Sequence, residues 1–311
     1  MGQAQGEIAL YYEGKDITEY VDILECVHRD VSGGESDCLN LLVDHADKWF
    51  QWFPQKNDRI QVRRSGYDTG TLYLNTLIPE DGATRIYATA MKCGAFRKAW
   101  DTFKDKTLAS IFQQVAAECG MGARIWGIQS GIVYPYILRE NQTAPVFLQM
   151  LANREGAVLK CLNGNYTAIG VQYAQELSAM HEVDMDSDLI SGRYIDRRDE
   201  RWAGVRIASM FAKGEARDGA GGNEFRTIST LEAEDNAQAA RWARGLLLMH
   251  NRNSEALELN MDFNPGYTAM VRIDVKSGTD ADGQWLVDEV EQDMINGRTS
   301  AKLLRCIATV Q

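Results

Sequence analysis

Short runs in which apolar and polar residues alternate dominate both ends of the chain. In residues 37–44, for example, Leu39, Leu41 and Val43 fall on one face. Period-two alternation over short runs, bounded by Gly, Asp and Pro, is typical of half-buried antiparallel strands. Runs of the same kind predict strands at 58–63, 70–78, 85–91, 205–211, 257–261, 271–276 and 303–308.

The middle of the chain follows a different pattern. Apolar residues recur at helical spacing from about residue 107 to 119, with Asp105 or Thr107 placed to cap the start and Gly120 after the end. A second helix fits residues 144–155, where Thr143 can serve as N-cap and a proline falls in the first turn.

A hairpin follows the second predicted helix. The runs 157–162 and 165–169 flank Asn163-Gly164. Both central residues of a type I′ turn need positive φ, which Asn and Gly tolerate best. The two helices and the hairpin therefore predict a small α+β unit between two β-rich parts.

One more loop and one more helix are predicted in the C-terminal part. Residues 213–223 are charged and rich in glycine, which favours a mobile loop. Residues 233–250 fit a helix, whose expected stripe is Ala237, Ala240, Ala243 and Leu247. We therefore expect a mainly β fold with an α+β insertion, divided into an N-terminal part over 1–98, the insertion over 99–182 and a C-terminal part over 183–311.

The charge balance limits the classes of partner. The 44 acidic and 33 basic residues give a formal net charge of −11. Tight nucleic-acid binding needs clustered Lys and Arg, yet the longest basic runs are Arg63-Arg64 and Arg197-Arg198. The longest apolar run, Leu246 to Met249, is far too short to span a bilayer, and the first residues lack the pattern of a signal peptide.

No motif for catalysis or for metal binding stands out. The six cysteines form no C-x-x-C pair and the four histidines no H-E-x-x-H, and both the G-x-S-x-G elbow and the phosphate-binding loop are missing. Asp184 to Asp188 resembles the start of a calcium loop, but Leu189 stands where that loop needs glycine. The sequence therefore predicts no catalytic residue, no metal site and no cofactor.

A dense aromatic cluster precedes Pro54. It consists of Trp49, Phe50, Trp52 and Phe53. Aromatic residues at this density anchor interfaces, pack in cores, or stack on sugars and bases. We favour a core or subunit-interface role for these four residues over ligand binding.

Several degenerate motifs occur in a fixed order along nearly the whole chain. Besides the Trp-rich segment, they are 36–41, 58–62, 69–74, 106–111, 141–143, 147–156, 264–266, 283–287 and 299–304. In this order they resemble the phage late control protein D family, the baseplate hub of contractile tails, which is related to the hub part of type VI secretion spike proteins.

The resemblance implies an architecture and a function without catalysis. Each chain would supply two tube-like antiparallel β-barrel domains on either side of the α+β insertion. A homotrimer would then form a pseudo-sixfold ring between the hexameric tail tube, or its initiator, and the trimeric central spike. Baseplate wedge proteins and the tape measure protein would be further partners, and DNA would pass only in transit. The expected location is the virion tail, after assembly in the host cytoplasm.

The acidic charge would then have a role, since a trimer would carry about −33, three times the charge of one chain. Carboxylates in the lumen would repel DNA during ejection. A type VI spike is a less favoured alternative, because the chain stops at Gln311 with no β-helical extension. Two other classes are a tail-associated cell-wall hydrolase, with its site in the middle part, and a carbohydrate-binding β-protein that uses Trp49 and Trp52.

Overall fold

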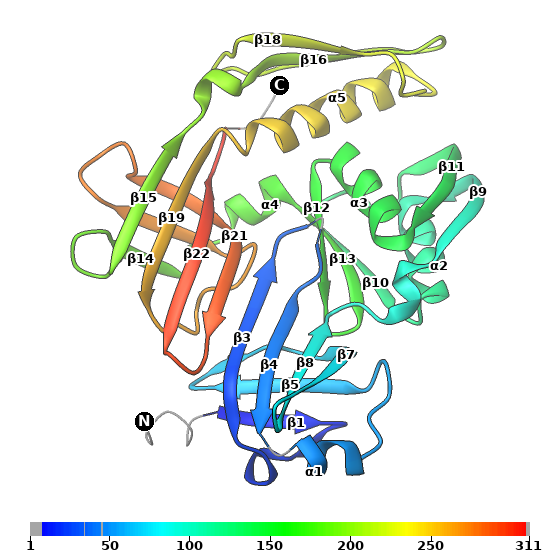
Figure 1. Cartoon of the computed structure of the whole chain (residues 1–311). Helices are drawn as coiled ribbons and strands as arrows, with labels where there is room; N and C mark the ends of the chain where they lie inside the picture. Colours follow the sequence, from blue (N-terminus) through cyan, green and yellow to red (C-terminus); the bar gives the residue numbers. More distant parts are fainter. Residues whose placement is uncertain (1–7, 34, 45, 309–311) are drawn as a thin grey trace.

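The centre of the molecule is a run of eight antiparallel strands, the main ladder (Figure 1). The computed structural model describes residues 8–33, 35–44 and 46–308. Across the main ladder the order is β15 (Ser191–Asp196), β19 (Glu255–Asp262), β22 (Arg298–Arg305), β21 (Gly283–Asp293), β3 (Ile23–Val31), β4 (Cys38–Asp44), β8 (Ala83–Thr89) and β7 (Leu72–Glu80).

Shorter strands continue this sheet and fold over the main ladder. In Figure 1, β1 and β5 run across the direction of β3 and β4. The N-terminal group, with its short helices, is β1 (Ile8–Tyr12), β2 (Lys15–Asp16), η2 (Thr18–Tyr20), α1 (Ala46–Gln51), β5 (Arg59–Arg64) and β6 (Tyr67–Asp68). The C-terminal group is β14 (His181–Asp184) and β20 (Arg272–Lys276).

The faces predicted from period-two alternation are the buried faces. On β4, Leu39, Leu41 and Val43 have no exposed surface, and on β5 the same holds for Ile60 and Val62. In the C-terminal half, the predicted face of β19 packs in a second apolar cluster with Trp285 of β21. Removal of these side chains from water supplies most of the driving force for folding of the sheet.

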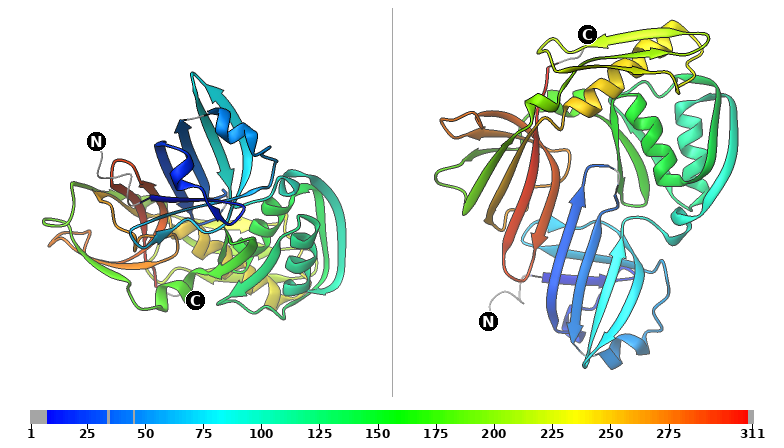
Figure 2. Two further views of the ribbon diagram at one scale, coloured as in Figure 1. Left: turned by 90° about the horizontal axis from the view of Figure 1, so that it is seen from below. Right: turned by 45° about the horizontal axis from the view of Figure 1, so that its top comes forward.

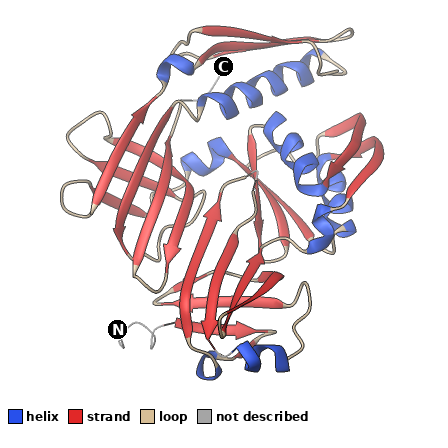
Figure 3. Ribbon diagram, in the orientation of Figure 1, coloured by secondary structure: helices blue, strands red, loops and turns tan. Residues whose placement is uncertain are grey.

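The insertion packs helices against small sheets beside the N-terminal strands (Figure 3). Its elements are η3 (Cys93–Phe96), β9 (Lys98–Thr107), α2 (Leu108–Glu118), β10 (Gly122–Trp126), β11 (Val133–Thr143), α3 (Ala144–Arg154), β12 (Ala157–Leu162), β13 (Asn165–Gly170) and α4 (Val171–Glu176). Strands β9 and β11 form an antiparallel ribbon, and β13 lies between β10 and β12.

The predicted ends of these elements are largely confirmed. Thr107 caps α2, since its Oγ1 accepts a hydrogen bond from Ser110 N at 3.1 Å, and Gly120 takes a φ of +66° after the helix. Asn163 and Gly164 both have positive φ, as the type I′ prediction requires. Thr143 stands at the N-cap of α3, but its side chain makes no capping hydrogen bond.

Residues 198–251 form a separate layer above the sheet, at the top of Figure 1. It comprises η4 (Arg198–Glu200), β16 (Trp202–Ala208), β17 (Lys213–Arg217), β18 (Glu224–Ile228) and α5 (Asn236–Asn251). Two predictions here were wrong. The strand expected over 205–211 ends at Ala208, and Met210 and Phe211 are exposed in the turn. Residues 213–217, the first part of the loop expected over 213–223, instead form β17, which pairs with β16 and lies so close to α5 that a Cβ at position 214 would be 2.0 Å from Ala240 N. Residues 218–223 belong to no strand, in agreement with the prediction.

The predicted stripe of α5 was also partly wrong. Ala237 is exposed and Ala240 half-buried, whereas Ala239 and Trp242 are buried. The helix is rotated because Gly245 approaches α3: a Cβ at position 245 would lie 2.2 Å from the carbonyl oxygen of Arg154. Only glycine permits two backbones to come this close.

The predicted fold class, mainly β with an α+β insertion, is confirmed. The alternation did not predict that the two β-rich ends share one sheet, through the pairing of β3 with β21 (Figure 2). The division into three parts at residues 98 and 182 stays a prediction. Among the helices in the described part of the chain, none is long and apolar enough to cross a membrane.

Candidate assembly surface and buried polar junction

The seam between the two halves of the main ladder is a polar contact as well as a strand pairing. Its register runs from Val31 opposite Glu289 to Val27 opposite Asp293. Arg29 Nε donates to Glu289 Oε1 at 2.5 Å, and this hydrogen bond, despite partial burial, raises the pKa of the guanidinium above its ordinary value. At the end of the seam, Ser32 Oγ donates to Asp288 Oδ1 at 2.5 Å.

One face of the main ladder points away from the apolar cores and carries rows of charges. Strand registers align these rows: Arg193 stands opposite Glu258, and Glu258 opposite Lys302. Acidic side chains outnumber basic ones. The acids are Glu25, Asp44, Glu80, Glu258, Asp262, Glu289, Glu291 and Asp293, and the bases are Arg29, Arg85, Arg193, Arg298 and Lys302.

Both ends of the main ladder present free strand edges. Among the described residues, β15 pairs with β19 alone. At the other end, β5 lies beside β7 only at Leu72 and Tyr73, so the stretch from Thr76 to Glu80 has β8 on one side and no described strand on the other. Unpaired N–H and C=O groups on such edges are templates for pairing with another chain.

The structure separates the four residues of the predicted aromatic cluster. Trp49 is fully buried and packs against Tyr12 and Trp52, with ring centroids 5.2 and 5.4 Å away. Phe50 and Phe53 are exposed, Phe53 by 80%. The buried indole of Trp49 cannot stack on a sugar, which counts against this part of the carbohydrate-binding alternative, whereas Trp52 is half-buried. A subunit-interface role for the exposed rings stays a prediction.

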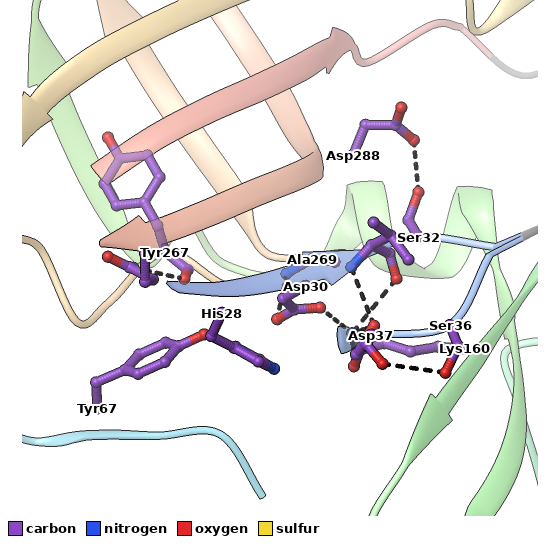
Figure 4. Close-up of polar contacts among 12 residues, drawn as sticks. His28, Asp30, Ser32, Ser36, Asp37, Tyr67, Lys160, Tyr267, Ala269 and Asp288 are labelled. Atoms are coloured by element: carbon purple, nitrogen blue, oxygen red, sulfur yellow. Dashed lines mark hydrogen bonds and ion pairs between the residues drawn. The ribbon is translucent and has the colours of Figure 1, made fainter. Parts of the chain in front are cut away.

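A buried ion cluster joins the insertion to the N-terminal strands (Figure 4). Lys160 of β12 forms ion pairs with Asp30 of β3 and with Asp37 just before β4; its Nζ lies 3.2 Å from Asp37 Oδ2. All three side chains are buried. Asp37 Oδ1 accepts from Val31 N at 3.0 Å, and Asp30 Oδ2 accepts from Ala269 N at 3.1 Å. The cluster therefore ties three distant chain segments together.

This cluster holds two carboxylates for one ammonium. Burial alone would lower the pKa of Lys160, but the two aspartates outweigh it and raise that pKa. Burial raises the pKa of Asp37, and the negative charge of Asp30 raises it further. The ammonium of Lys160 acts in the opposite direction but is outweighed. The raised pKa of Lys160 follows from the two carboxylates around it, and the raised pKa of Asp37 follows mainly from burial.

His28 lies beside the cluster, and only one of its two ring nitrogens makes a hydrogen bond within the described residues. Its Nδ1 lies 2.7 Å from the hydroxyl oxygen of Tyr67, while Nε2 has no hydrogen-bond partner among the described residues. Burial lowers the pKa of His28 to about 4, although nearby carboxylates oppose this. The imidazole is therefore neutral at pH 7.

These groups form the base of a cavity of about 570 Å³. Its wall comes from the N-terminal strands, the insertion and the loop before β20, and it includes Trp126, Tyr173 and Met270. Trp126 and Tyr173 line the cavity and are also 44% and 40% exposed, so both rings are accessible to solvent. An apolar cavity with a few convergent polar groups is the usual form of a ligand site.

Sequence reasoning missed all the polar groups of this junction. One signal was present: Lys160 interrupts the otherwise apolar run of β12, AVLKCL. All residues of this strand except the last are buried. A charged residue in such a strand needs a buried partner. Its partners lie 123 and 130 residues away, and no local pattern identifies them.

The described residues also bear on the predictions about metals and cysteines. Cys26, Cys119 and Cys161 are buried free thiols, and the other three cysteines are half-buried. Within the described ranges, no group of three or more His, Cys, Asp or Glu residues could hold a metal ion.

Comparison with known proteins finds similar structures but no similar sequences. No protein-family model and no curated protein sequence matches the chain. A tail protein of Neisseria meningitidis shares 12% identity and a TM-score of 0.74, with 96% of each chain covered. The 43 kDa tail protein of prophage MuSo2 from Shewanella oneidensis shares 16% identity and a TM-score of 0.69, again over 96% of each chain.

A third similar structure is a component of the type VI secretion system of E. coli, described as similar to the bacteriophage T4 tail proteins gp27 and gp5. It matches at 11% identity and a TM-score of 0.62, over 96% of this chain and 76% of that one. The resemblance indicated by the sequence motifs is thus confirmed at the level of fold: nearly the whole chain has the fold of these phage tail proteins and of this type VI secretion component.

Proposed function

We propose that the protein is a structural baseplate hub of a contractile phage or phage-like tail. Three copies form a pseudo-sixfold ring that joins the hexameric tail tube to the trimeric central spike and lets DNA pass. The protein acts without catalysis, in the virion, after assembly in the host cytoplasm. The fold shared with tail proteins supports this proposal.

The observation that carries the proposal is the main ladder with its two free edges. Each chain contributes two blocks of four strands, joined at the seam between β3 and β21. Three chains therefore supply six similar blocks, which is the symmetry that a hexameric tube requires. The free edge of β15 in one copy would pair with the free part of β7 in the next, and such head-to-tail contacts close into rings.

The outward face of the main ladder would line the channel. Its acidic side chains outnumber the basic ones, so a ring of three copies would present a mildly negative wall to DNA. Like charges discourage sticking of the phosphate backbone during ejection. Ion pairs such as Arg298–Asp262 and Arg85–Glu25 would keep the remaining arginines from binding phosphate.

The mass in solution tests the ring, both for the chain alone and for the chain mixed with spike protein. The expected trimer has a mass of about 104 kDa, three times 34.8 kDa. A protein that stays monomeric and binds neither the spike nor the tube protein would overturn the hub proposal.

Disulfide cross-linking tests the edges that meet. Arg193→Cys on β15 and Ile78→Cys on β7 stand on exposed parts of the free edges. Oxidation of the double variant should give dimers and trimers that stop at the trimer. Matched controls are each single variant and the pair Tyr87→Cys with Ser300→Cys, which lie inside the main ladder. If the protein is a trimer in solution but the double variant does not cross-link specifically, the proposed contact between β15 and β7 is wrong, although the trimer itself is supported.

A further inference from the structure

The cavity at the buried junction has a charge excess that the chain itself does not balance. Asp30 and Asp37 face one ammonium, that of Lys160. Asp68 also lines the cavity, but its carboxylate is paired with Arg63, with 2.9 Å between Nε and Oδ2, so it does not add to this excess. His28 and Tyr67, the other titratable groups at this base, carry no positive charge at pH 7. A buried negative charge without a counterion is unfavourable unless a proton or a cation from outside compensates it.

His28 provides a second, independent indication of a ligand. The ring is only 2% exposed, and Nε2 lacks a hydrogen-bond partner among the described residues. Figure 4 shows this ring lying beside the cluster, with its unpaired end toward Asp37 and Lys160. When Nδ1 carries the proton and donates to Tyr67, Nε2 is an acceptor for a donor placed in the cavity.

The aromatic part of the cavity wall also favours a cation. Trp126 and Tyr173 combine partial exposure with a place in the cavity wall. Aromatic faces attract ammonium groups through the ring quadrupole, and they exclude anions. The volume of about 570 Å³ is within the range of small-molecule sites.

We propose that this cavity binds an organic ammonium group, which compensates the excess carboxylate charge of Asp30 and Asp37 and donates a hydrogen bond to His28 Nε2. A free aliphatic amine and a lysine side chain of a neighbouring protein present the same group. No residue of the free edges of β15 and β7 lines this cavity, so the proposal goes beyond the hub function and does not depend on it.

Calorimetric titration of the full-length protein at pH 7.5 tests the charge requirement. The probes are n-butylammonium chloride and Nα-acetyl-lysine amide, each compared with a neutral analogue of the same shape, 1-butanol and Nα-acetyl-norleucine amide. The amines should bind at least tenfold more tightly than their neutral partners. Binding of butylammonium alone indicates a small-amine site, whereas binding of the lysine amide indicates capture of a partner side chain. No saturable amine binding, or equal binding of neutral analogues, overturns the proposal.

Two variants, each of which removes one carboxylate charge, test where the amine binds. Asp37→Asn should weaken amine binding at least tenfold, because Lys160 and Asp30 then balance. Asp262→Asn removes an exposed carboxylate on the main ladder, 88% exposed, and should leave binding unchanged. Equal losses in both variants would show general attraction to an acidic protein and overturn the site.

A spectroscopic readout in the unaltered protein covers the case in which Asp37→Asn fails to fold. The imidazole ¹⁵N resonances of His28 should shift at Nε2 on amine addition, as expected for a new hydrogen bond. Amine affinity should also fall below neutral pH, because a proton on Asp37 then replaces the cation. Binding without any shift at His28 Nε2, or affinity constant down to pH 5, contradicts the proposed site.

Discussion

Arg29 of β3 and Glu289 of β21 form an ion pair across the seam that joins the two β-rich ends of the chain, with 2.5 Å between Nε and Oε1. The two residues are 260 positions apart in sequence. Each side chain is about one-third exposed, so water screens the pair only in part. The pair therefore adds a diagonal side-chain contact to the strand pairing through which the halves of the main ladder meet.

A double-mutant cycle of Arg29→Ala and Glu289→Ala measures this contact. We expect a coupling free energy of about 0.5–1 kcal/mol, the range for partly exposed pairs with good geometry. Urea unfolding gives the four stabilities. The pair Arg193 and Glu258, more exposed and away from the seam, is the control and should couple less. A coupling of zero at the seam would show that this ion pair adds nothing to the strand pairing and to the other contacts there.

Lys160→Met should be strongly destabilising, by about 3–5 kcal/mol, because it leaves two buried carboxylates without a counterion. Thermal or urea unfolding measures the loss. Lys104→Met on the exposed side of β9 is the matched control and should change stability by less than about 0.5 kcal/mol.

The charge-free version of this cluster tests the cause of the loss. Addition of Asp30→Asn and Asp37→Asn to Lys160→Met should recover much of the stability, since no unpaired charge remains buried. A triple variant that is no more stable than Lys160→Met would show that lost packing, and not charge, is responsible.

Gly245→Ala should destabilise the packing of α5 on α3, although alanine favours helices. The added Cβ would meet the carbonyl oxygen of Arg154 at 2.2 Å, and the two helices would have to separate. We expect a loss of about 1–3 kcal/mol, as for overpacked cores. At Gly219 a Cβ would meet no atom within 4 Å, so Gly219→Ala should be nearly neutral. Equal stability of the two variants would contradict the close approach.

His28 should make stability depend on pH in acid. Its folded-state pKa is about 4, below the value of about 6.5 for an unfolded chain. The unfolded state therefore binds the proton first, and the contribution of His28, about 3 kcal/mol, is complete above pH 6.5 and is lost as pH falls toward 4.

Comparison with His28→Gln isolates this effect, since Asp37, whose pKa is raised, contributes with the opposite sign over part of the same range. The free energy of unfolding, measured from pH 7 to pH 4, should fall more for the wild type than for His28→Gln. Parallel pH profiles would show that His28 has the same pKa in the folded and the unfolded protein, which contradicts this prediction.

Local patterns predicted much of the fold. The buried faces of β4, β5 and β19, the cap at Thr107 and the turn at Asn163-Gly164 all depend on residues within one element, where periodicity and backbone preference act directly. The predictions for 209–217 and for the stripe of α5 were wrong because contacts with β16 and α3 outweigh local propensity.

By itself, the sequence determined most of the segments that are strands or helices, which face of several strands is buried, and the order of motifs that resembles a tail hub. Tertiary structure alone decided that β3 pairs with β21 and that Lys160 meets Asp30 and Asp37. These contacts join residues that are more than a hundred positions apart. No local sequence pattern indicates which distant strand or side chain will be the partner. The cavity beside His28 exists only because three separate segments converge there.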